Sequence, residues 1–385
     1  MNYLVLGGGL QGRVVAYDIL KFEPGSKVTI ADIDEASLKI AKDLIDDKNL
    51  SVAVCDIFNH KQAVELMEKA DVIINGLPHN WETTESFYKA MMVCKNKKAV
   101  FTDYWMWDKQ YQFSDELKKN NNLVVPGLGI VPGFGNICGG QLALEFERLD
   151  EVFIYCGGLP TKRGVAPLDY MVLFNVEALL DLYLTPPTVI EDGVLKVTEP
   201  LTDLETVFIP GYGDVKALKT DGLYSLNKTL IEKGVQRAAE FTCRYPGHYE
   251  WMQTLDKAGF FSKEAIEVDG QQVVPRAFSE KVLNSLMEKI PGVRDFTYLY
   301  VVGRGLKDGV LTEKTYTLLD HSDEEVGITS MMRTTAYPSS IAAMIVAHDI
   351  NDKFGVIEPE SIFVGDMFEK MCTELSKRGL MVYGK

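Results

Sequence analysis

The feature that most constrains this chain is a glycine fingerprint close to its N-terminus. Gly7, Gly9 and Gly12 follow directly after the apolar run 3–6 and open a segment with helical periodicity. In a strand–turn–helix unit the first glycine permits a tight turn, the second lets the backbone approach a pyrophosphate, and the third allows close packing of helix on strand. Asp32 stands 20 residues beyond Gly12, at the end of the next apolar run. This spacing predicts that the chain binds a dinucleotide.

The acid that ends the second predicted strand indicates which dinucleotide is bound. The Asp32 carboxylate is suited to accept hydrogen bonds from the adenosine ribose. Ile33 and Asp34 follow it, so no arginine stands there to neutralise a 2′-phosphate. We therefore expect NAD rather than NADP. The pyrophosphate is expected on the free amides at the start of the first helix, where Leu10 and Gln11 lie.

Two further polar residues follow predicted strands of the same domain. Asp56 comes after the third strand and Asn75 ends the fourth. Ligands gather at the carboxyl ends of parallel strands, so Asp56 is expected to reach the adenine and Asn75 the nicotinamide ribose. The alternative for both residues is an Asx turn at the end of a strand.

The first 125 residues alternate short apolar runs with helical patterns. Apolar runs occur at 3–6, 27–31, 51–54, 71–75, 99–102 and 123–125, and helical periodicity is clear at 35–45 and 61–69. Strand and helix repeated in this way predict a parallel sheet covered on both faces. The N-terminal part is therefore expected to be an α/β, doubly wound domain of the Rossmann type.

The alternation ends at residues 126–136, where glycine and proline are concentrated as in a loop. A helix is expected at 136–147, and strand-like runs at 152–156, 206–209, 239–244, 296–302, 312–319 and 327–334 predict an α+β domain with a mixed sheet. A helix is expected to begin near Pro338 and to run to about Ile350. We therefore predict a Rossmann domain at 1–130, completed by 335–385, with an inserted substrate-binding and oligomerisation domain at 131–334.

Composition excludes several classes of function. The formal charge of −15 disfavours binding to nucleic acid or to anionic membranes. The longest apolar run, 341–347, is far shorter than the ~20 residues that a membrane-spanning helix needs. The six cysteines and five histidines are scattered without the spacing of metal ligands, so no metal is expected. Because we find no leader sequence, the expected location is the cytoplasm.

Several short motifs together resemble a known family. The fingerprint, PGLGIVPG at 126–133, YCGGLP at 155–160, CRYPGH at 243–248 and RTTAYP at 333–338 resemble the saccharopine dehydrogenase superfamily. The stretch PLDYMVLFNVEALLDLY at 167–183 and the histidine after the RYxG element are more similar to its lysine 6-dehydrogenase branch. The resemblance covers essentially the whole chain.

The resemblance implies a cofactor, an assembly and a reaction. It implies NAD and a homo-oligomer, either a homodimer or a homotetramer. It also implies oxidative deamination of the ε-amino group of lysine to 2-aminoadipate 6-semialdehyde. The segment Asp103–Trp107, DYWMW, departs from the lysine branch because it keeps the acid but adds bulky aromatic side chains.

Oxidation of an amine by hydride transfer requires a neutral nitrogen, and therefore a base. An alkylamine has a pKa near ~10.4, and histidine is the side chain that ordinarily titrates near neutral pH. His248 is therefore the expected catalytic base, with an ordinary hydrogen-bonded histidine as the alternative. Arg244, four residues earlier, is expected to bind the substrate carboxylate, which is the role of the RYxG arginine in the family. Arg333 is a second choice, with an ion pair as its alternative.

Acidic and aromatic residues complete the predicted substrate site. Asp103 is a candidate for catalysis, directly or through water, and Asp221, in the run Lys219–Gly222 with Thr220, is a candidate to bind a cationic group. Glu177 matches the lysine branch, although solvated or capping roles are equally compatible with these acids. Tyr104, with Trp105 and Trp107, is expected to line the nicotinamide pocket, with a plain aromatic core as the alternative.

Two other functions stay open on the sequence. A saccharopine-type enzyme of the same fold would act on a secondary amine and would need a second anion site, for which Lys162 and Arg163 are candidates. A non-catalytic NAD-binding regulator would instead have a cleft in which Arg244 and His248 do not converge.

Overall fold

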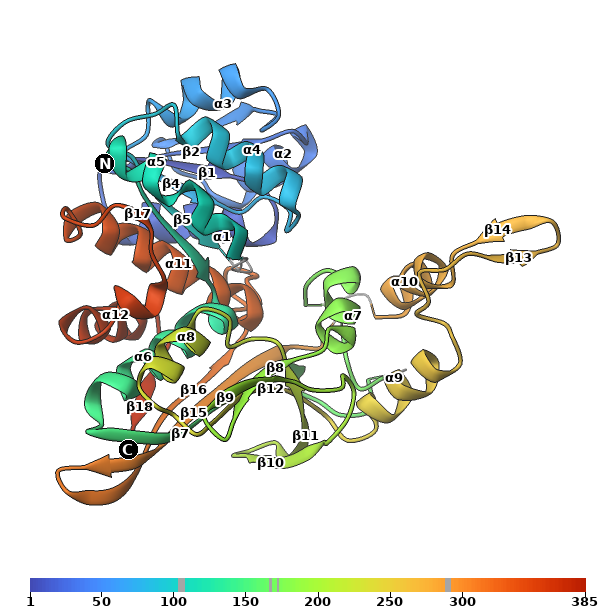
Figure 1. Cartoon of the computed structure of the whole chain (residues 1–385). Helices are drawn as coiled ribbons and strands as arrows, with labels where there is room; N and C mark the ends of the chain where they lie inside the picture. The colour runs from blue at the N-terminus through green and yellow to red at the C-terminus, as the bar shows by residue number, and fades with distance from the viewer. Residues whose placement is uncertain (103–107, 166–167, 172, 288–291) are drawn as a thin grey trace.

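The fold is described from a computed structural model that covers residues 1–102, 108–165, 168–171, 173–287 and 292–385. Two large sheets organise the chain (Figure 1). Sheet A has seven parallel strands in the order β17-β6-β5-β4-β1-β2-β3. Its strands are β1 (Asn2–Leu6), β2 (Lys27–Asp32), β3 (Leu50–Val54), β4 (Val72–Asn75), β5 (Lys98–Thr102), β6 (Leu123–Leu128) and β17 (Gly355–Val356).

Helices cover both faces of sheet A. Alternate residues of the central strands β1, β4, β5 and β6 enter two separate apolar cores, as expected for strands buried on both sides. The core on one face includes α1 (Leu10–Phe22), α2 (Glu35–Leu44) and α11 (Ser330–His348). The core on the other face includes α3 (His60–Met67), α4 (Trp81–Met91) and α5 (Ser114–Lys119), with a 3₁₀ turn at Asp108–Phe113. The doubly wound α/β prediction is confirmed.

Sheet B is mixed, as the sequence predicted. Its main path is β10-β11-β12-β7-β15-β16-β18, in which β12 and β7 are parallel and the other neighbours antiparallel. The strands are β7 (Arg148–Pro160), β10 (Glu205–Ile209), β11 (Gly213–Thr220), β12 (Arg237–Arg244), β15 (Asp295–Lys307), β16 (Val310–His321) and β18 (Val382–Gly384), with β8 (Thr188–Glu191) and β9 (Val194–Val197) attached beside β12.

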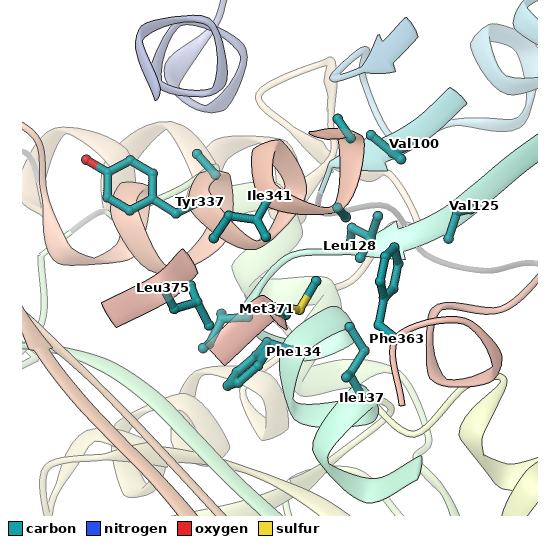
Figure 2. Close-up of a cluster of buried hydrophobic side chains, with 14 of the residues drawn as sticks. Val100, Val125, Leu128, Phe134, Ile137, Tyr337, Ile341, Phe363, Met371 and Leu375 are labelled. Carbon is teal, nitrogen blue, oxygen red and sulfur yellow. The ribbon is translucent and has the colours of Figure 1, made fainter. Parts of the chain in front are cut away.

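The remaining elements surround sheet B. They are α6 (Gly135–Glu145), α7 (Val176–Leu184), α8 (Leu226–Glu232), α9 (His248–Lys257), α10 (Pro275–Leu286), α12 (Asp366–Lys377), and short turns at Ile130–Phe134 and Pro359–Ser361. The hairpin β13 (Ile266–Val268) and β14 (Gln271–Val273) extends away from the body beyond α10 (Figure 1). One apolar core joins the two sheets. Figure 2 shows side chains from β6, α6, α11 and α12 meeting there, among them Leu128, Ile137, Ile341 and Met371.

The C-terminal segment contributes to both sheets. Helix α11 packs on α1 and β17 extends sheet A, as expected for a segment that returns to the first domain. Strand β18, in contrast, pairs with β16 in sheet B. Residues 335–385 therefore do not belong to the first domain alone.

One local prediction is wrong. Residues 327–334 are not a strand, because α11 begins at Ser330 and carries Pro338 in its interior. The Thr329 side chain caps this helix by accepting a hydrogen bond from the Met332 amide. The β-branched pair at 334–335 suggested a strand. Burial of nearly the whole helix outweighs that preference and the cost of an interior proline, about 3 kcal/mol.

Candidate functional site

The glycine loop between β1 and α1 has the geometry that its sequence predicts. Gly7 has φ of +98°, and a Cβ atom there would lie 2.5 Å from the carbonyl oxygen of Gly76. A Cβ at Gly12 would overlap the carbonyl oxygen of Gly7. A Cβ at Gly9 would meet no atom within 4 Å. Gly7 and Gly12 are therefore required by the protein itself, whereas Gly9 faces open space.

The first turn of α1 is suited to bind an anion. Gly9 is its N-cap and supplies no side-chain hydrogen bond, so the first amides of the helix lack a side-chain acceptor. Leu10 is 46% exposed, and the buried Oε1 of Gln11 has no hydrogen-bond partner. Free amides at the positive end of the helix dipole, next to open space, fit the pyrophosphate of a dinucleotide.

Asp32 lies beside this loop at the end of β2. Its Oδ2 accepts a hydrogen bond from the Gly8 amide at 2.6 Å, and its Oδ1 accepts one from the Asp34 amide at 2.8 Å. The carboxylate is therefore held in place while it stays partly exposed. A fixed carboxylate accepts hydrogen bonds from a ribose diol and repels a 2′-phosphate. Asp32 thus offers a fixed acceptor for a ribose beside the glycine loop.

We expect Asp32→Ser to weaken NAD binding about tenfold, because the hydrogen bonds to the ribose are lost. Binding of NADP should not weaken, because the repulsive charge is gone. Fluorescence titration with NADH and NADPH measures both affinities. Asp34→Ser is the matched control, since serine can also cap α2, where Asp34 now accepts from the amides of Ala36 and Ser37. An unchanged ratio of affinities in Asp32→Ser would contradict this role.

Asp56 and Asn75 differ in how far their side chains are already satisfied. Asp56 accepts a hydrogen bond from the Phe58 amide at 2.9 Å, which is the Asx turn named as its alternative. Asn75 is buried, and its Oδ1 accepts from the Leu77 amide at 3.3 Å. The Nδ2 of Asn75 is buried without a hydrogen-bond partner. Of these two residues, Asn75 keeps an unused donor at the carboxyl end of β4.

A large cavity lies between the carboxyl ends of β4 and β5 and the β11–α8 region. It has a volume of about 1260 Å³. Trp81, Lys109 and Tyr111 line it from the first domain, and Asp221 and Tyr224 line it from the second. A ligand in this cavity would be in contact with both domains, at the edge of sheet A where a dinucleotide of this fold binds.

Arg244, at the end of β12, is a nearly completely buried cation. It is 2% exposed, and its Nε and Nη1 donate to the Tyr183 hydroxyl at 2.8 Å and to the Cys243 carbonyl at 2.7 Å. Within the described residues, no carboxylate lies within ion-pair distance of Arg244. Burial of a guanidinium without a counter-ion costs several kcal/mol. The attraction of a bound carboxylate would offset a free energy of about this size.

A chain of hydrogen bonds holds Arg244 in place. Nδ1 of His248 lies 3.0 Å from the Leu168 carbonyl, which can only accept, so Nδ1 carries the proton. Nε2 of His248 therefore accepts from the Tyr183 hydroxyl at 3.0 Å, and that hydroxyl in turn accepts from Arg244. His248 and Arg244 converge, with Tyr183 between them.

The environment of His248 disfavours the role of a base. Burial, followed by the nearby Arg244 charge, lowers the pKa of His248 to about 3. Both ring nitrogens are occupied, and the residue is 1% exposed. A neutral imidazole with both ring nitrogens occupied does not take up a proton near neutral pH. The structure favours the alternative that the sequence left open, a hydrogen-bonded histidine, whose partners are the Tyr183 hydroxyl and the Leu168 carbonyl.

Thr220 belongs to a second buried polar group on the same face of sheet B. Its hydroxyl donates to Glu240 and is 2.8 Å from the Thr242 hydroxyl. Glu240 is 3% exposed, and burial raises its pKa to about 8. Asp221 follows directly and accepts from the Thr188 amide at 3.2 Å. The Thr220 hydroxyl is therefore used inside the protein, whereas Asp221 lines the cavity.

Glu240 makes stability depend on pH. A glutamate in an unfolded chain has a pKa near ~4.3, so the folded protein retains a proton that the unfolded chain releases between about pH 4 and pH 8. The contribution to stability is therefore complete below about pH 4 and is lost as the pH rises to about 8. Glu240→Gln has no carboxyl group to ionise. Its stability relative to the wild type should therefore rise by about 3 kcal/mol between pH 5.5 and pH 9.

Thermal unfolding at the two pH values measures this effect. Glu267→Gln, an exposed position in the β13–β14 hairpin, is the matched control and should follow the wild type at both. If the stability of Glu240→Gln and that of the wild type changed equally with pH, Glu240 would ionise normally in the folded protein.

Comparison with known families identifies both parts of the chain. A family model described as the saccharopine dehydrogenase NADP binding domain matches residues 3–125. A second, described as the saccharopine dehydrogenase C-terminal domain, matches residues 129–380. The chain belongs to the saccharopine dehydrogenase family. The resemblance found in the sequence motifs is confirmed at the level of the family, and a nicotinamide cofactor and an oxidoreductase function follow from it.

Similar proteins differ in the amines that their names specify. The chain is 23% identical to a carboxyaminopropylagmatine dehydrogenase from Synechocystis, over 93% of this chain and 92% of the relative. It is 21% identical to an alpha-aminoadipic semialdehyde synthase from Arabidopsis thaliana, over 74% of this chain but 28% of that longer protein. The apo saccharopine dehydrogenase (L-Glu forming) from Saccharomyces cerevisiae has the same fold, with a TM-score of 0.81, 20% identity, and coverage of 100% and 99% of the two chains.

The remaining predicted residues are Glu177 and Arg333, whose surroundings the structure describes, and residues that fall outside the described ranges. Glu177 is exposed in the first turn of α7, where its charge favours the helix dipole. Arg333 forms ion pairs with Asp320 and Asp323, so its alternative as a structural ion pair is what the structure shows. The candidates Asp103 and Tyr104, with Trp105 and Trp107, fall in 103–107, outside the described residues.

Sequence reasoning missed three residues of the site. Tyr170 and Tyr183 flank the Arg244 guanidinium, with ring centroids 4.8 and 5.7 Å from its carbon atom. Glu240 is the third. The two tyrosines belong to the stretch 167–183 that resembles the lysine branch. The sequence therefore marked this stretch but did not indicate what either tyrosine does. Glu240 carried no signal, because nothing local marks a glutamate in a strand as buried.

No helix in the described ranges is both long and apolar enough to cross a membrane.

Proposed function

We propose that this member of the saccharopine dehydrogenase family uses NAD to oxidise a C–N bond in an amine that carries a carboxylate, and that its reaction is deamination of lysine at the ε-amino group. The observation that carries the proposal is Arg244, a buried cation without a counter-ion among the described residues. The partly exposed Asp32 carboxylate and its two backbone hydrogen bonds favour NAD.

The residues of the chain bind and orient the reactants. The glycine loop and Asp32 would hold the cofactor, which would supply the acceptor for the hydride that leaves the carbon next to nitrogen. Arg244 binds the substrate carboxylate as a planar fork. The amine must lose a proton before the hydride leaves, and Asp103, directly or through water, is our remaining candidate for this step. Water then adds to the imine, and ammonia leaves with formation of the aldehyde.

A second candidate function, oxidation of a longer secondary amine, is favoured by one distance. Arg244 pairs with Lys216 across β11 and β12, and Asp221 lies five residues further along. Strand geometry therefore separates the two Cα atoms by about 16 Å, at ~3.3 Å per residue. A substrate that contacts both side chains must span the part of this distance that the arginine and aspartate side chains do not cover. If Asp221 binds substrate together with Arg244, the substrate carries its carboxylate and its cation at widely separated ends, as the name carboxyaminopropylagmatine of one relative suggests.

An NADH-formation screen at alkaline pH tests these functions. Lysine, ornithine, saccharopine and carboxyaminopropylagmatine are the substrates to compare. NADH together with free ammonia from lysine supports deamination. NADH from either secondary amine, with glutamate or an oxo acid as product, supports the second candidate. If none of the four gives NADH with NAD or NADPH with NADP, both proposals fail, and the regulator becomes the better hypothesis.

A further inference from the structure

Tyr170 carries a buried hydroxyl that the protein itself does not satisfy. The residue is 1% exposed, and among the described residues its hydroxyl oxygen has no hydrogen-bond partner. Buried hydroxyl groups almost always have a partner, because leaving one unpaired costs free energy. A phenylalanine would fill the same space without this cost. The hydroxyl therefore requires an explanation outside the folding of the chain.

The ring of Tyr170 lies against the Arg244 guanidinium. The guanidinium carbon is 4.8 Å from the ring centroid, a distance at which a cation is attracted to the aromatic face. Burial raises the pKa of Tyr170 and the Arg244 charge opposes this rise, so the hydroxyl is within electrostatic reach of the guanidinium and stays protonated. A neutral hydroxyl donor thus lies in one buried place with a cation that has no ion-pair partner among the described residues.

The other aromatic residues around Arg244 do not meet these two demands. The Tyr183 hydroxyl is used between Arg244 and His248, and the Tyr249 hydroxyl donates to the Thr242 carbonyl at 2.6 Å. The His248 ring packs edge-on against Tyr170 at 5.4 Å between centroids, which fixes the position of the tyrosine ring. Tyr170 is thus the member of this aromatic group whose donor is free for a ligand.

One ligand group satisfies the cation and the donor together. A carboxylate has two acceptor oxygens and one negative charge, so it can accept from Arg244 and from a hydroxyl at the same time. A phosphate would bring more negative charge than one cation neutralises, and Arg244 is the single cation of this aromatic cluster within the described residues. A carboxylate therefore matches the site better.

We propose that Tyr170 is a specificity-determining residue, whose hydroxyl donates a hydrogen bond to the substrate carboxylate that Arg244 binds. The inference rests on the proposed function, since it concerns the same substrate. It adds that recognition of the carboxylate has two parts, a charge from Arg244 and a neutral donor from Tyr170. Amines without a carboxylate should gain nothing from the Tyr170 hydroxyl.

The test compares Tyr170→Phe with the wild type on paired substrates. For the amino acid that the screen identifies, we expect KM to rise about tenfold while kcat changes little. For the same amine without its carboxylate, pentane-1,5-diamine in the case of lysine, KM should be unchanged. Tyr300→Phe, on the opposite face of sheet B, is the matched loss of a hydroxyl and should behave as the wild type with both. Equal KM values for Tyr170→Phe and the wild type on the amino acid would overturn the inference and leave the proposed function intact.

A binding measurement keeps the two proposals separable. Glutarate, a carboxylate without an amine, is titrated into the NAD-loaded enzyme by calorimetry. Binding to the wild type that is about tenfold weaker in Tyr170→Phe supports the role of Tyr170 even if the screen detects no oxidation. Equal affinity of the two proteins, or no binding to the wild type, counts against it.

Discussion

Arg244→Met is expected to lower kcat/KM for the amino acid substrate about 1000-fold, mainly through KM. The carboxylate would enter a buried pocket without its cationic partner, and breaking a buried ion pair in this way costs ~3–5 kcal/mol. Methionine fills most of the space and removes the unpaired charge of the free enzyme, so the fold should be retained. Steady-state kinetics with the amino acid and with its decarboxylated counterpart measure the effect.

The decarboxylated amine provides the internal control for Arg244→Met. Its kinetics should change little, because it presents no carboxylate to this position. Arg244→Lys is the sharper comparison. A lysine keeps the charge but cannot reproduce the fork that donates to Tyr183, to Cys243 and to the ligand together, so it should restore only part of the loss. Equal losses for the substrates with and without a carboxylate would show that Arg244 supports the fold and does not bind substrate.

The central strands of sheet A, β1, β4, β5 and β6, were predictable from sequence because they are buried on both faces. Such strands are continuous apolar runs, and the fingerprint at Gly7–Gly12 fixes where the first helix begins. Helix α11 was not predictable in the same way. Its first turns contain Thr334 and Thr335, and its helical state depends on the Thr329 cap and on burial against α1, which are tertiary facts.

The candidate site was predictable in its members more than in their roles. The spacing of Arg244 and His248 predicted that the carboxylate-binding residue and the expected base lie together. The structure does bring the two side chains together, through Tyr183. The low pKa of His248 depends on complete burial and on the Arg244 charge, and neither is visible in one sequence. Tyr170 and Glu240 were missed for the same reason, since burial and an unsatisfied hydroxyl belong to the folded chain.

Gly9→Ala is expected to abolish most cofactor binding while leaving the fold unchanged. Gly9 has φ of −66°, which any residue adopts, and a Cβ there would meet no protein atom within 4 Å. The added methyl group would instead occupy the open space in front of the uncapped α1 amides, where the pyrophosphate is predicted. We expect NADH affinity to fall about 100-fold, measured by fluorescence titration, with an unchanged Tm.

Gly12→Ala distinguishes this effect from ordinary damage to the loop. Its Cβ would overlap the Gly7 carbonyl oxygen, so α1 would have to move away from β1, and both Tm and NADH affinity should fall. The two glycines are three residues apart in one turn, yet one is required by the protein and the other by the ligand. Normal NADH binding by Gly9→Ala would therefore mean that the dinucleotide does not cross this helix terminus, and the assignment of Asp32 to the ribose would fall with it.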